Sequence, residues 1–283
     1  MSTIAFDALA CPLDGGPLHR RDGAWCCEAG HSFDIARQGY VHLLPVQRKR
    51  SRDPGDSKEM VAARRRFLDA GHYQPIAKAV AQAVLKGAPA DEALHCLDAG
   101  CGEGYYLREL EGVAGDNQKL ALLGVDISKW AVLAAAKSWK SATWLVGTNA
   151  QLPVQTSSLE RVLCMFGFPV YAEFARVLKS GGELLLVEAG PDHLRELREI
   201  IYPEIKSPRR ESDTVPEGFV RTGDSETLRY AVDLADATQI ADLLAMTPYL
   251  HRANAEGRAR AAALESLSVS VDVRITRFTC HAA

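Results

Sequence analysis

Three features are missing from this sequence of 283 residues, and each absence narrows the class of protein. No apolar run approaches the ~20 residues that a membrane-spanning helix needs, so we expect no membrane partner. The N-terminus carries Asp7 and has no sustained apolar core, so we expect no secretory signal peptide. The net charge is −3, so the chain has no global basic field, and any RNA-binding surface must be a local patch.

The seven cysteines do not indicate a disulfide framework, because the chain is long and lacks a secretory context. We therefore expect the protein in the cytoplasm. With 47% apolar residues, the chain can bury one substantial core together with a small accessory unit. We divide it into a small unit at 1–45, a basic connector with helices at 46–89, and a main α/β domain at 90–283.

The segment that organises the chain is a glycine-rich turn. Residues 93–97 are apolar and predict a buried strand, which leads into Asp98 and the glycines at 100, 102 and 104. A helix-compatible run, 105–110, follows. Glycine permits positive φ and a close approach of backbone to ligand, and the helix N-terminus offers free N–H groups. This is the opening βα unit of a nucleotide-binding sheet.

The next predicted strand, 120–125, ends in Asp126, which is placed to accept hydrogen bonds from a ribose diol. NAD, FAD and S-adenosylmethionine are all bound in this way. An acid directly before the glycines is poorly placed for a pyrophosphate but well placed beside a cationic methionine group, so Asp98 favours S-adenosylmethionine. Binding of another nucleotide and a vestigial pocket remain the alternatives. Asn149 and Ala150 follow a further predicted strand, 142–146, where class I methyltransferases contact adenine.

The N-terminal unit has a candidate metal site. Cys11 and Asp14 form one pair of possible ligands, and Cys27 and His31 form a second pair across a short loop. This is zinc-ribbon spacing, in which two ligand pairs fix a fold too small to build its own core. Asp14 stands where a second thiolate is usual, and Cys26 could serve in its place. A zinc site and a metal-free unit of the same shape both fit the sequence.

The connector is strongly basic. A phosphate-binding strip and an ordinary solvated face are both compatible with this pattern, and the contrast with the negative chain favours the strip. The residues concerned are Arg48, Lys49, Arg50, Arg52, Arg64, Arg65 and Arg66.

Two further features lie where the strands of an open α/β sheet end, which is where ligands bind. Phe166 and Phe168 follow the predicted strand 159–165 and either face the transferred methyl group or are ordinary packing aromatics. His193 near a helix start could bind a cofactor carboxylate or could be a surface residue.

Taken together, these segments resemble the RlmA family of bacterial 23S rRNA (guanine-N1)-methyltransferases. The most specific segments are Gly39–Gln47, Arg50–Ser57, Ala63–Arg65 and Phe67–Pro75, all of which lie outside the cofactor motif. The resemblance covers nearly the whole chain. It implies a class I S-adenosylmethionine-dependent methyltransferase with a Rossmann-like seven-stranded sheet and a small N-terminal zinc-ribbon-like domain.

The resemblance also implies roles for particular residues. Tyr73, the turn 100–105 and His193 would contact S-adenosylmethionine, and the family's zinc ligands fall at Cys11, Asp14, Cys27 and His31. The full predicted cofactor set is Tyr73, Asp98, Gly100, Cys101, Gly102, Glu103, Gly104, Tyr105, Asp126, Ile127, Asn149, Ala150 and His193.

The implied reaction is direct methyl transfer to guanine N1 in a hairpin loop of 23S rRNA, where the target base is unpaired or flipped out. The N-terminal unit and the basic strip would hold the hairpin, and a homodimer is possible. The sequence departs from the family at Asp14 and at 166–169, where Phe-Gly-Phe-Pro replaces a segment resembling Tyr-Ala-Pro-Cys. No general base can be identified. A methyltransferase for a small molecule or another RNA, and a non-catalytic RNA-binding relative, are the alternatives.

Overall fold

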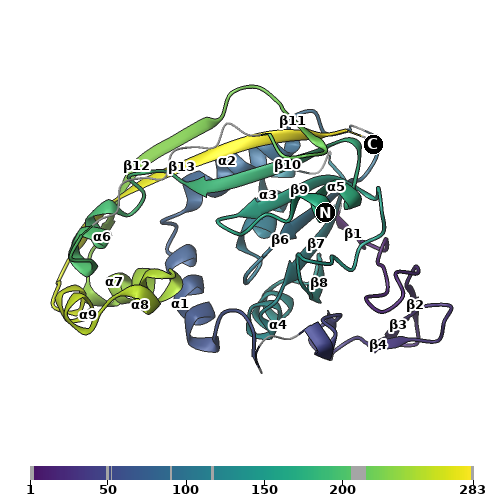
Figure 1. The fold of residues 1–283 in the computed structure, drawn as a ribbon, viewed down its shortest axis with the longest axis horizontal. Helices are drawn as coiled ribbons and strands as arrows, with labels where there is room; N and C mark the ends of the chain where they lie inside the picture. The colour runs from purple at the N-terminus through teal and green to yellow at the C-terminus, as the bar shows by residue number, and fades with distance from the viewer. Residues whose placement is uncertain are drawn as a thin grey trace.

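The computed structural model describes residues 3–48, 51, 53–89, 91–115, 118–204 and 215–281. In these ranges a ten-stranded main sheet carries helices on its faces, and a three-stranded sheet lies at one end (Figure 1). No helix in the described ranges is both long and apolar enough to cross a membrane.

The main sheet has the strand order β11-β13-β10-β9-β6-β7-β8-β5, with β1 paired to β7 and β12 paired to β13. Its strands are β1 (Thr3–Ile4), β5 (Tyr40–His42), β6 (Leu94–Ala99), β7 (Leu120–Asp126), β8 (Thr143–Val146), β9 (Leu159–Met165), β10 (Leu178–Ala189), β11 (Phe219–Arg221), β12 (Glu226–Leu234) and β13 (Leu267–Cys280). Strands β6 to β10 run parallel to one another, while β13 runs antiparallel to β10. The predicted class I sheet is confirmed in the order β8-β7-β6-β9-β10-β13-β12, and β1, β5 and β11 extend it.

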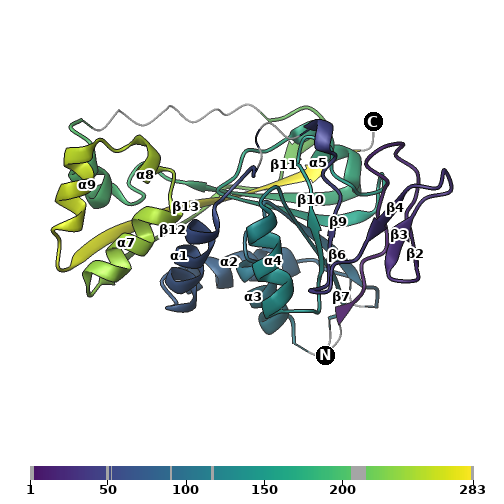
Figure 2. The same cartoon turned by 90° about the horizontal axis from the view of Figure 1, so that it is seen from below.

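The helices cover both faces of this sheet (Figure 2). They are α1 (Lys58–Asp69), α2 (Gln74–Leu85), α3 (Tyr105–Ala114), α4 (Lys129–Ser138), α5 (Tyr171–Val177), α6 (Arg195–Ile201), α7 (Ala237–Met246), α8 (Tyr249–Arg252) and α9 (Ala255–Ala262), with a 3-10 turn η1 at Val46–Arg48. Side-chain caps define four of the starts: Ser57 caps α1, Ser128 caps α4, Asp236 caps α7 and Asn254 caps α9.

Two apolar clusters lie on opposite sides of the sheet. The first joins β6 and β7 to α2, α3 and α4, and continues to α7 and the paired strands β12 and β13. The second joins the other face of the same strands to α5 and to the N-terminal segment, including the fully buried Phe6 and Leu9. The strands are buried on both faces, which explains their nearly continuous apolar sequences.

The N-terminal unit is a small ribbon of β2 (His19–Arg21), β3 (Ala24–Cys26) and β4 (Ser32–Asp34). Asp22 and Gly23 both have positive φ in the turn between β2 and β3, as expected for an Asp-Gly hairpin turn. The segments that flank the ribbon enter the main sheet. Thr3 pairs with Leu120, and Tyr40 pairs with Trp144. The ribbon is therefore joined to the main domain through hydrogen-bonded strands as well as through the connector.

Candidate functional site

The glycine turn lies where the carboxyl ends of β6, β7 and β8 meet. The N–H groups of Gly100 and Cys101 both donate to the carbonyl of Val125, which holds the turn against the end of β7. Gly100, Gly102 and Gly104 have φ values of 101°, 55° and 83°, in the left-handed region that favours glycine. At Gly104 a Cβ atom would also lie 2.4 Å from the buried ring of Trp144, so the position excludes a side chain for two reasons.

Asp98, at the end of β6, is the clearest indication of a ligand. The residue is 0% exposed, and neither carboxyl oxygen has a hydrogen-bond partner in the described residues. Burial, together with the nearby Asp126 carboxylate, raises the pKa of Asp98 to about 7. An unpaired buried carboxyl group is costly unless a ligand satisfies it, and a cationic ligand does so best. The site therefore fits S-adenosylmethionine, whose sulfonium and amino groups are positive.

Asp126 closes the far side of the turn. Its Oδ2 accepts from the N–H of Gly102 at 2.9 Å, and its Oδ1 accepts from the N–H of Ser128 at 2.7 Å. Each carboxylate oxygen keeps acceptor capacity for a ribose hydroxyl. Asn149 donates to the carbonyl of Ala99 at 3.2 Å and so brings the loop after β8 to the same edge. The half-exposed Ile127 and the exposed Ala150 lie on these two loops.

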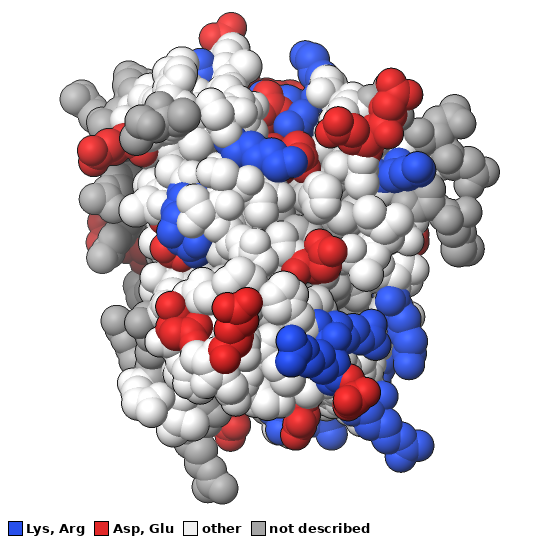
Figure 3. Space-filling view, turned by 90° about the vertical axis from the view of Figure 1, so that its right-hand side faces the viewer, with Lys and Arg blue, Asp and Glu red and all other residues white. Residues whose placement is uncertain are grey.

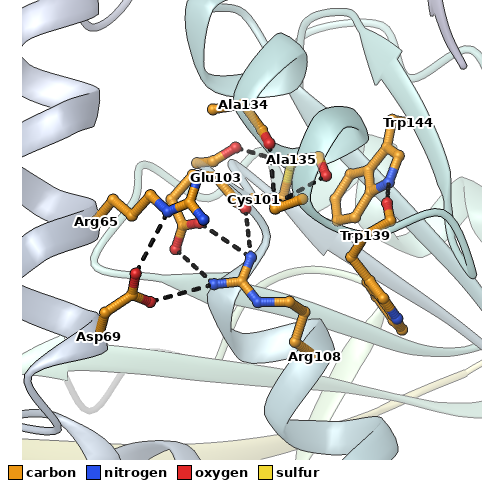
Figure 4. A network of polar contacts seen from close by, with 11 residues as sticks. Arg65, Asp69, Cys101, Glu103, Arg108, Ala134, Ala135, Trp139 and Trp144 are labelled. Atoms are coloured by element: carbon orange, nitrogen blue, oxygen red, sulfur yellow. Dashed lines mark hydrogen bonds and ion pairs between the residues drawn. The ribbon is translucent and has the colours of Figure 1, made fainter. Parts of the chain in front are cut away.

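Glu103 joins the turn to helix α1 through a chain of charges (Figure 4). Its carboxylate is 1% exposed and pairs with Arg108 of α3 at 2.9 Å. Arg108 also lies 3.9 Å from Asp69, which in turn pairs with Arg65 at 3.3 Å. Burial raises the pKa of Glu103, and the Arg108 pair opposes this shift. Arg108 was not predicted from the sequence, although a basic residue five positions after a buried acid at a helix start is a usable signal.

Tyr73, Phe166 and His193 form an aromatic cluster beside the turn. The Tyr73 hydroxyl lies 3.2 Å from Nε2 of His193, and the ring of Phe166 stacks on His193 with centroids 5.6 Å apart. Nδ1 of His193 accepts from the N–H of Asp272 at 3.3 Å, so Nε2 carries the proton and donates to Tyr73. His193 is buried, and this burial lowers its pKa to about 4. The alternative of a surface histidine is wrong.

The two phenylalanines after β9 have different surroundings. Phe166 has a φ of 52° and packs on Tyr73 and His193, so its ring belongs to the wall of the cluster. The side chain of Phe168 is 91% exposed. A phenylalanine so exposed gains nothing from packing in the free protein. Phe168 is therefore the more exposed of the two rings, while Phe166 is 39% exposed.

The arginines of α1 are all paired within the chain. Arg64 contacts Asp56 and donates to the carbonyl of Met246 at 3.1 Å, and its Nη1 would lie 3.8 Å from a Cβ on Gly102. Arg65 belongs to the chain of charges at Glu103. Arg66 makes a bidentate pair with Asp242 of α7, at 2.8 and 2.5 Å.

These pairs give Arg64, Arg65 and Arg66 a role in joining α1 to the cofactor turn and to α7. Their predicted contact with RNA stays a prediction, and it would require these ion pairs to be exchanged or shared. For the rest of the strip, Lys49, Arg50 and Arg52 lie outside the described residues, and only the backbone of Arg48, in η1, is described.

The candidate metal site is assembled in the ribbon. Cys11, Asp14, Cys27 and His31 offer four ligand atoms that all lie within 4.8 Å of one another. Oδ2 of Asp14 lies 3.0 Å from Nδ1 of His31 and 3.3 Å from Sγ of Cys27. Oδ1 of Asp14 accepts from the N–H of Gly16 at 2.8 Å, which aims Oδ2 at the other ligands. The four donors fit one tetrahedral Zn²⁺ ion. Cys26 contacts Ser32 and is not in this group.

Comparisons with known proteins agree with this arrangement. Residues 9–52 match the zinc-ribbon family described as "RlmA, N-terminal", and residues 96–182 match a methyltransferase domain family. YxjB of Bacillus subtilis, which carries the name of a 23S rRNA (guanine-N1)-methyltransferase, is 33% identical over 96% of this chain and 97% of its own length. The 23S rRNA (guanine(748)-N1)-methyltransferase of Streptomyces fradiae is 37% identical over 67% of this chain and 66% of its own length.

Among solved structures, YcgJ of Bacillus subtilis covers 72% of this chain and 98% of its own length, with 16% identity and a TM-score of 0.45. The alignment with YxjB covers 96% of the chain and so includes both the ribbon and the sheet. S-adenosylmethionine is the cofactor of the main domain, and the N-terminal unit is a zinc ribbon with a four-ligand group. The chain therefore belongs to the RlmA family of S-adenosylmethionine-dependent methyltransferases.

Proposed function

We propose that this protein methylates N1 of a guanine in a hairpin loop of 23S rRNA. The observation that carries the proposal is the alignment of 96% and 95% of the chain, ribbon included, with two relatives named for this reaction. A small-molecule methyltransferase has no need of a ribbon fixed to its sheet by strand pairing.

In this proposal the cofactor supplies an electrophilic methyl group, and the chain positions it. The buried Asp98 lies opposite the positive methionine group, and Asp126 accepts from the ribose. Because Nε2 of His193 donates to Tyr73, the hydroxyl proton of Tyr73 is left to donate to the cofactor carboxylate. Orientation of two reactants in this way contributes roughly 7–11 kcal/mol in favourable cases.

Phe168 supports the substrate side of the proposal. Its exposed ring belongs to the segment that follows β9, two residues after Phe166 of the cluster around Tyr73. Aromatic rings stack on bases that have left a helix or a loop, and this is how single-stranded RNA is commonly recognised. We propose that Phe168 stacks on a nucleotide of the loop, while Phe166 supports His193.

The ribbon offers a second RNA contact. Arg20 and Arg21 of β2 and Arg37 after β4 are exposed, and in the described part of the chain none of them forms an ion pair. Figure 3 shows Lys and Arg side chains gathered on one part of the face that carries the ribbon. Unpaired guanidinium groups are freer to contact phosphates than the paired arginines of α1.

The decisive experiment is transfer of labelled methyl from S-adenosylmethionine to unmethylated 23S rRNA, with the product nucleoside identified by mass spectrometry. We expect 1-methylguanosine. Another methylated nucleoside would overturn the atom and the base, and cofactor binding without any transfer would favour the non-catalytic alternative.

A paired set of variants separates the two basic surfaces. Replacing Arg20, Arg21 and Arg37 with Gln should weaken RNA affinity and reduce its salt dependence, without changing cofactor affinity. Replacing Arg64, Arg65 and Arg66 with Gln should instead lower cofactor affinity and stability, because these residues support the turn. If only the second set altered the salt dependence of RNA binding, the strip on α1 would be the phosphate contact.

A further inference from the structure

An open hollow of about 470 Å³, lined by both polar and apolar groups, lies between the paired strands β12 and β13 and the segment that leads into α6. Arg229 and Asp272 occupy paired positions on β12 and β13, and Asp192, Arg195 and Ser270 complete its polar lining. None of these residues belongs to the predicted cofactor set or to the metal site.

The central feature of the hollow is an arginine held by a buried acid. Asp272 is 2% exposed, and its Oδ1 accepts from Nε of Arg229 at 3.0 Å. Its Oδ2 accepts from the N–H of Asp192 at 3.1 Å. A Cβ on Gly190 would lie 2.3 Å from this oxygen, so only glycine leaves room for the carboxylate. Asp272 is thus fixed on both sides.

This anchoring leaves the outer part of Arg229 available. The side chain is 65% exposed, and its hydrogen bond to Asp272 uses Nε, so in the described residues the two Nη groups are not committed to the chain. When Nε of an arginine is fixed and both Nη groups are free, the guanidinium group is preorganised to donate to two coplanar acceptors.

The hollow adjoins the proposed methyl-transfer site. The N–H of the same Asp272 donates to Nδ1 of His193, which contacts Tyr73 and stacks on Phe166. Asp272 therefore forms part of both the aromatic cluster and the hollow, and Gly190 follows directly after β10, whose carboxyl end faces the same edge as that of β9.

The charges of the hollow indicate the kind of ligand. Arg195 pairs with Asp192 at 3.2 Å and with Glu199 at 2.8 Å, and Arg229 is balanced by Asp272. A backbone phosphate would meet carboxylates as well as guanidinium groups and would gain little. A base edge, which is neutral and carries its own acceptors and donors, suits such a lining. Arginine pairs with O6 and N7 of guanine, and this leaves N1 of the base free.

We propose that Arg229, held by Asp272, reads the O6/N7 edge of the target guanine while its N1 faces the methyl donor. Arg229 is then a specificity-determining residue and Asp272 a positioning residue. The inference rests on the proposed function, since it presumes guanine as the substrate.

The test uses the full-length protein and a hairpin transcript with a single 7-deazaguanosine at the guanine that the wild-type enzyme methylates. Loss of N7 removes one of the two acceptors but leaves N1 unchanged. We expect kcat/KM of the wild type to fall roughly 2- to 12-fold on this substrate, because one of the two hydrogen bonds of a bidentate pair accounts for about half of its discrimination. For Arg229→Gln, kcat/KM should differ little between the two transcripts, because the guanidinium group that contacts the base edge is absent.

Three outcomes are distinguishable. If the wild type methylates neither transcript, the proposed function fails. If the wild type methylates both equally, or if Arg229→Gln keeps the full penalty for 7-deazaguanosine, the function stands and the inference is overturned. Arg258→Gln, an exposed arginine of α9 outside the hollow, is the matched control and should behave as the wild type.

Asp272→Asn tests the positioning role. We expect this variant to lose part of the discrimination between the two transcripts, while cofactor affinity measured by calorimetry stays near the wild-type value. A variant that loses cofactor affinity and discrimination together would assign Asp272 to the packing around His193 instead. Thermal unfolding of each variant identifies any general loss of structure.

Discussion

At the scale of single residues, the buried Asp98 lowers the stability of the fold and at the same time favours binding of a cationic ligand. Its carboxyl group has a raised pKa because burial disfavours the charged form. In the unfolded chain the pKa of this carboxyl group has its ordinary value of 3.8, whereas burial raises the pKa to about 7 in the folded protein. Ionised Asp98 therefore destabilises the fold, and this effect appears as pH rises from about 4 to about 7.

We expect Asp98→Asn to be more stable than the wild type at pH 8, by on the order of a few kcal/mol, and to be nearly equal to it at pH 4. Urea unfolding at the two pH values measures the difference. A variant equally destabilised at both pH values would show that Asp98 is ionised and paired in the fold.

The same pKa predicts that cofactor binding depends on pH. A cationic ligand requires the ionised carboxylate, so binding should release a proton at pH 6 and release little at pH 8.5. Calorimetry in buffers of different ionisation enthalpy counts the protons. Asp98→Asn should bind the cofactor weakly and without this proton release, and equal release by the variant would assign the proton to another group.

Asp14 leads to a prediction about metal chemistry at the same scale. The ribbon offers two thiolates, one carboxylate and one imidazole. The Co²⁺-loaded protein should show the absorption spectrum of a tetrahedral site, with the charge-transfer intensity of two coordinated thiolates. In Asp14→Cys this intensity should rise to that of three thiolates, and the variant should bind Zn²⁺ more tightly. Equal intensity in both proteins would exclude position 14 from the metal.

At the scale of elements, the sequence pattern determined most of the fold. The limits of β9 agree with the predicted strand 159–165, because an apolar run defines it. Helix α5 was not predicted, since its seven residues follow Pro169 and lack a long apolar period. The pairing of Arg66 with Asp242 also could not be predicted, because the two residues come together only through the packing of α1 on α7.

The packing of Trp144 of β8 against Gly124 of β7 can be tested by substitution. A Cβ on Gly124 of β7 would lie 2.3 Å from its ring and 2.9 Å from Sγ of Cys101, whereas a Cβ on Gly112 of α3 meets nothing within 4 Å. Gly124→Ala should lose roughly 1–3 kcal/mol of stability through overpacking. Gly112→Ala should gain up to about 1 kcal/mol from helix propensity.

Urea midpoints of the two variants provide the comparison, and each serves as a control for the other. A Gly124→Ala protein as stable as the wild type would mean that the Trp144 ring moves freely. Because Trp144 packs on both the turn and β7, we also expect this variant to bind the cofactor less tightly.

At the scale of the whole molecule, the ribbon and the main domain share one core. Phe6, Leu9 and Trp25 pack in the same cluster as β6 and β9, and the sequence did not indicate this because nothing local encodes the pairing of distant strands. The division at residue 45 was made on composition and stays a prediction. Burial of each large apolar side chain contributes about 1.5–3 kcal/mol to the stability of the fold, so removal of this segment should destabilise the protein severely.

A chain beginning at residue 46 tests this. We expect it to aggregate, because the edge of β8 and the apolar face under Phe6 and Leu9 would be uncovered. Size-exclusion chromatography with light scattering gives the readout. A full-length chain with Cys11 and Cys27 replaced by Ser is the control, since it loses metal ligands but keeps the covering segment. A monomeric truncated protein that binds cofactor would establish 46–283 as an independent domain.

The pairing of β5 with β8 has a consequence during synthesis. Tyr40 leaves the ribosome about a hundred residues before its partner Trp144, a delay of roughly 5–20 s at ordinary rates of translation. Throughout that interval β5 lacks its partner β8 and can form only its bridge to Ile35. The four metal ligands lie upstream of it and emerge earlier, so a nascent chain that captures zinc promptly has a folded ribbon while it waits. Zinc supply during translation therefore bears on how much of this protein reaches its native state.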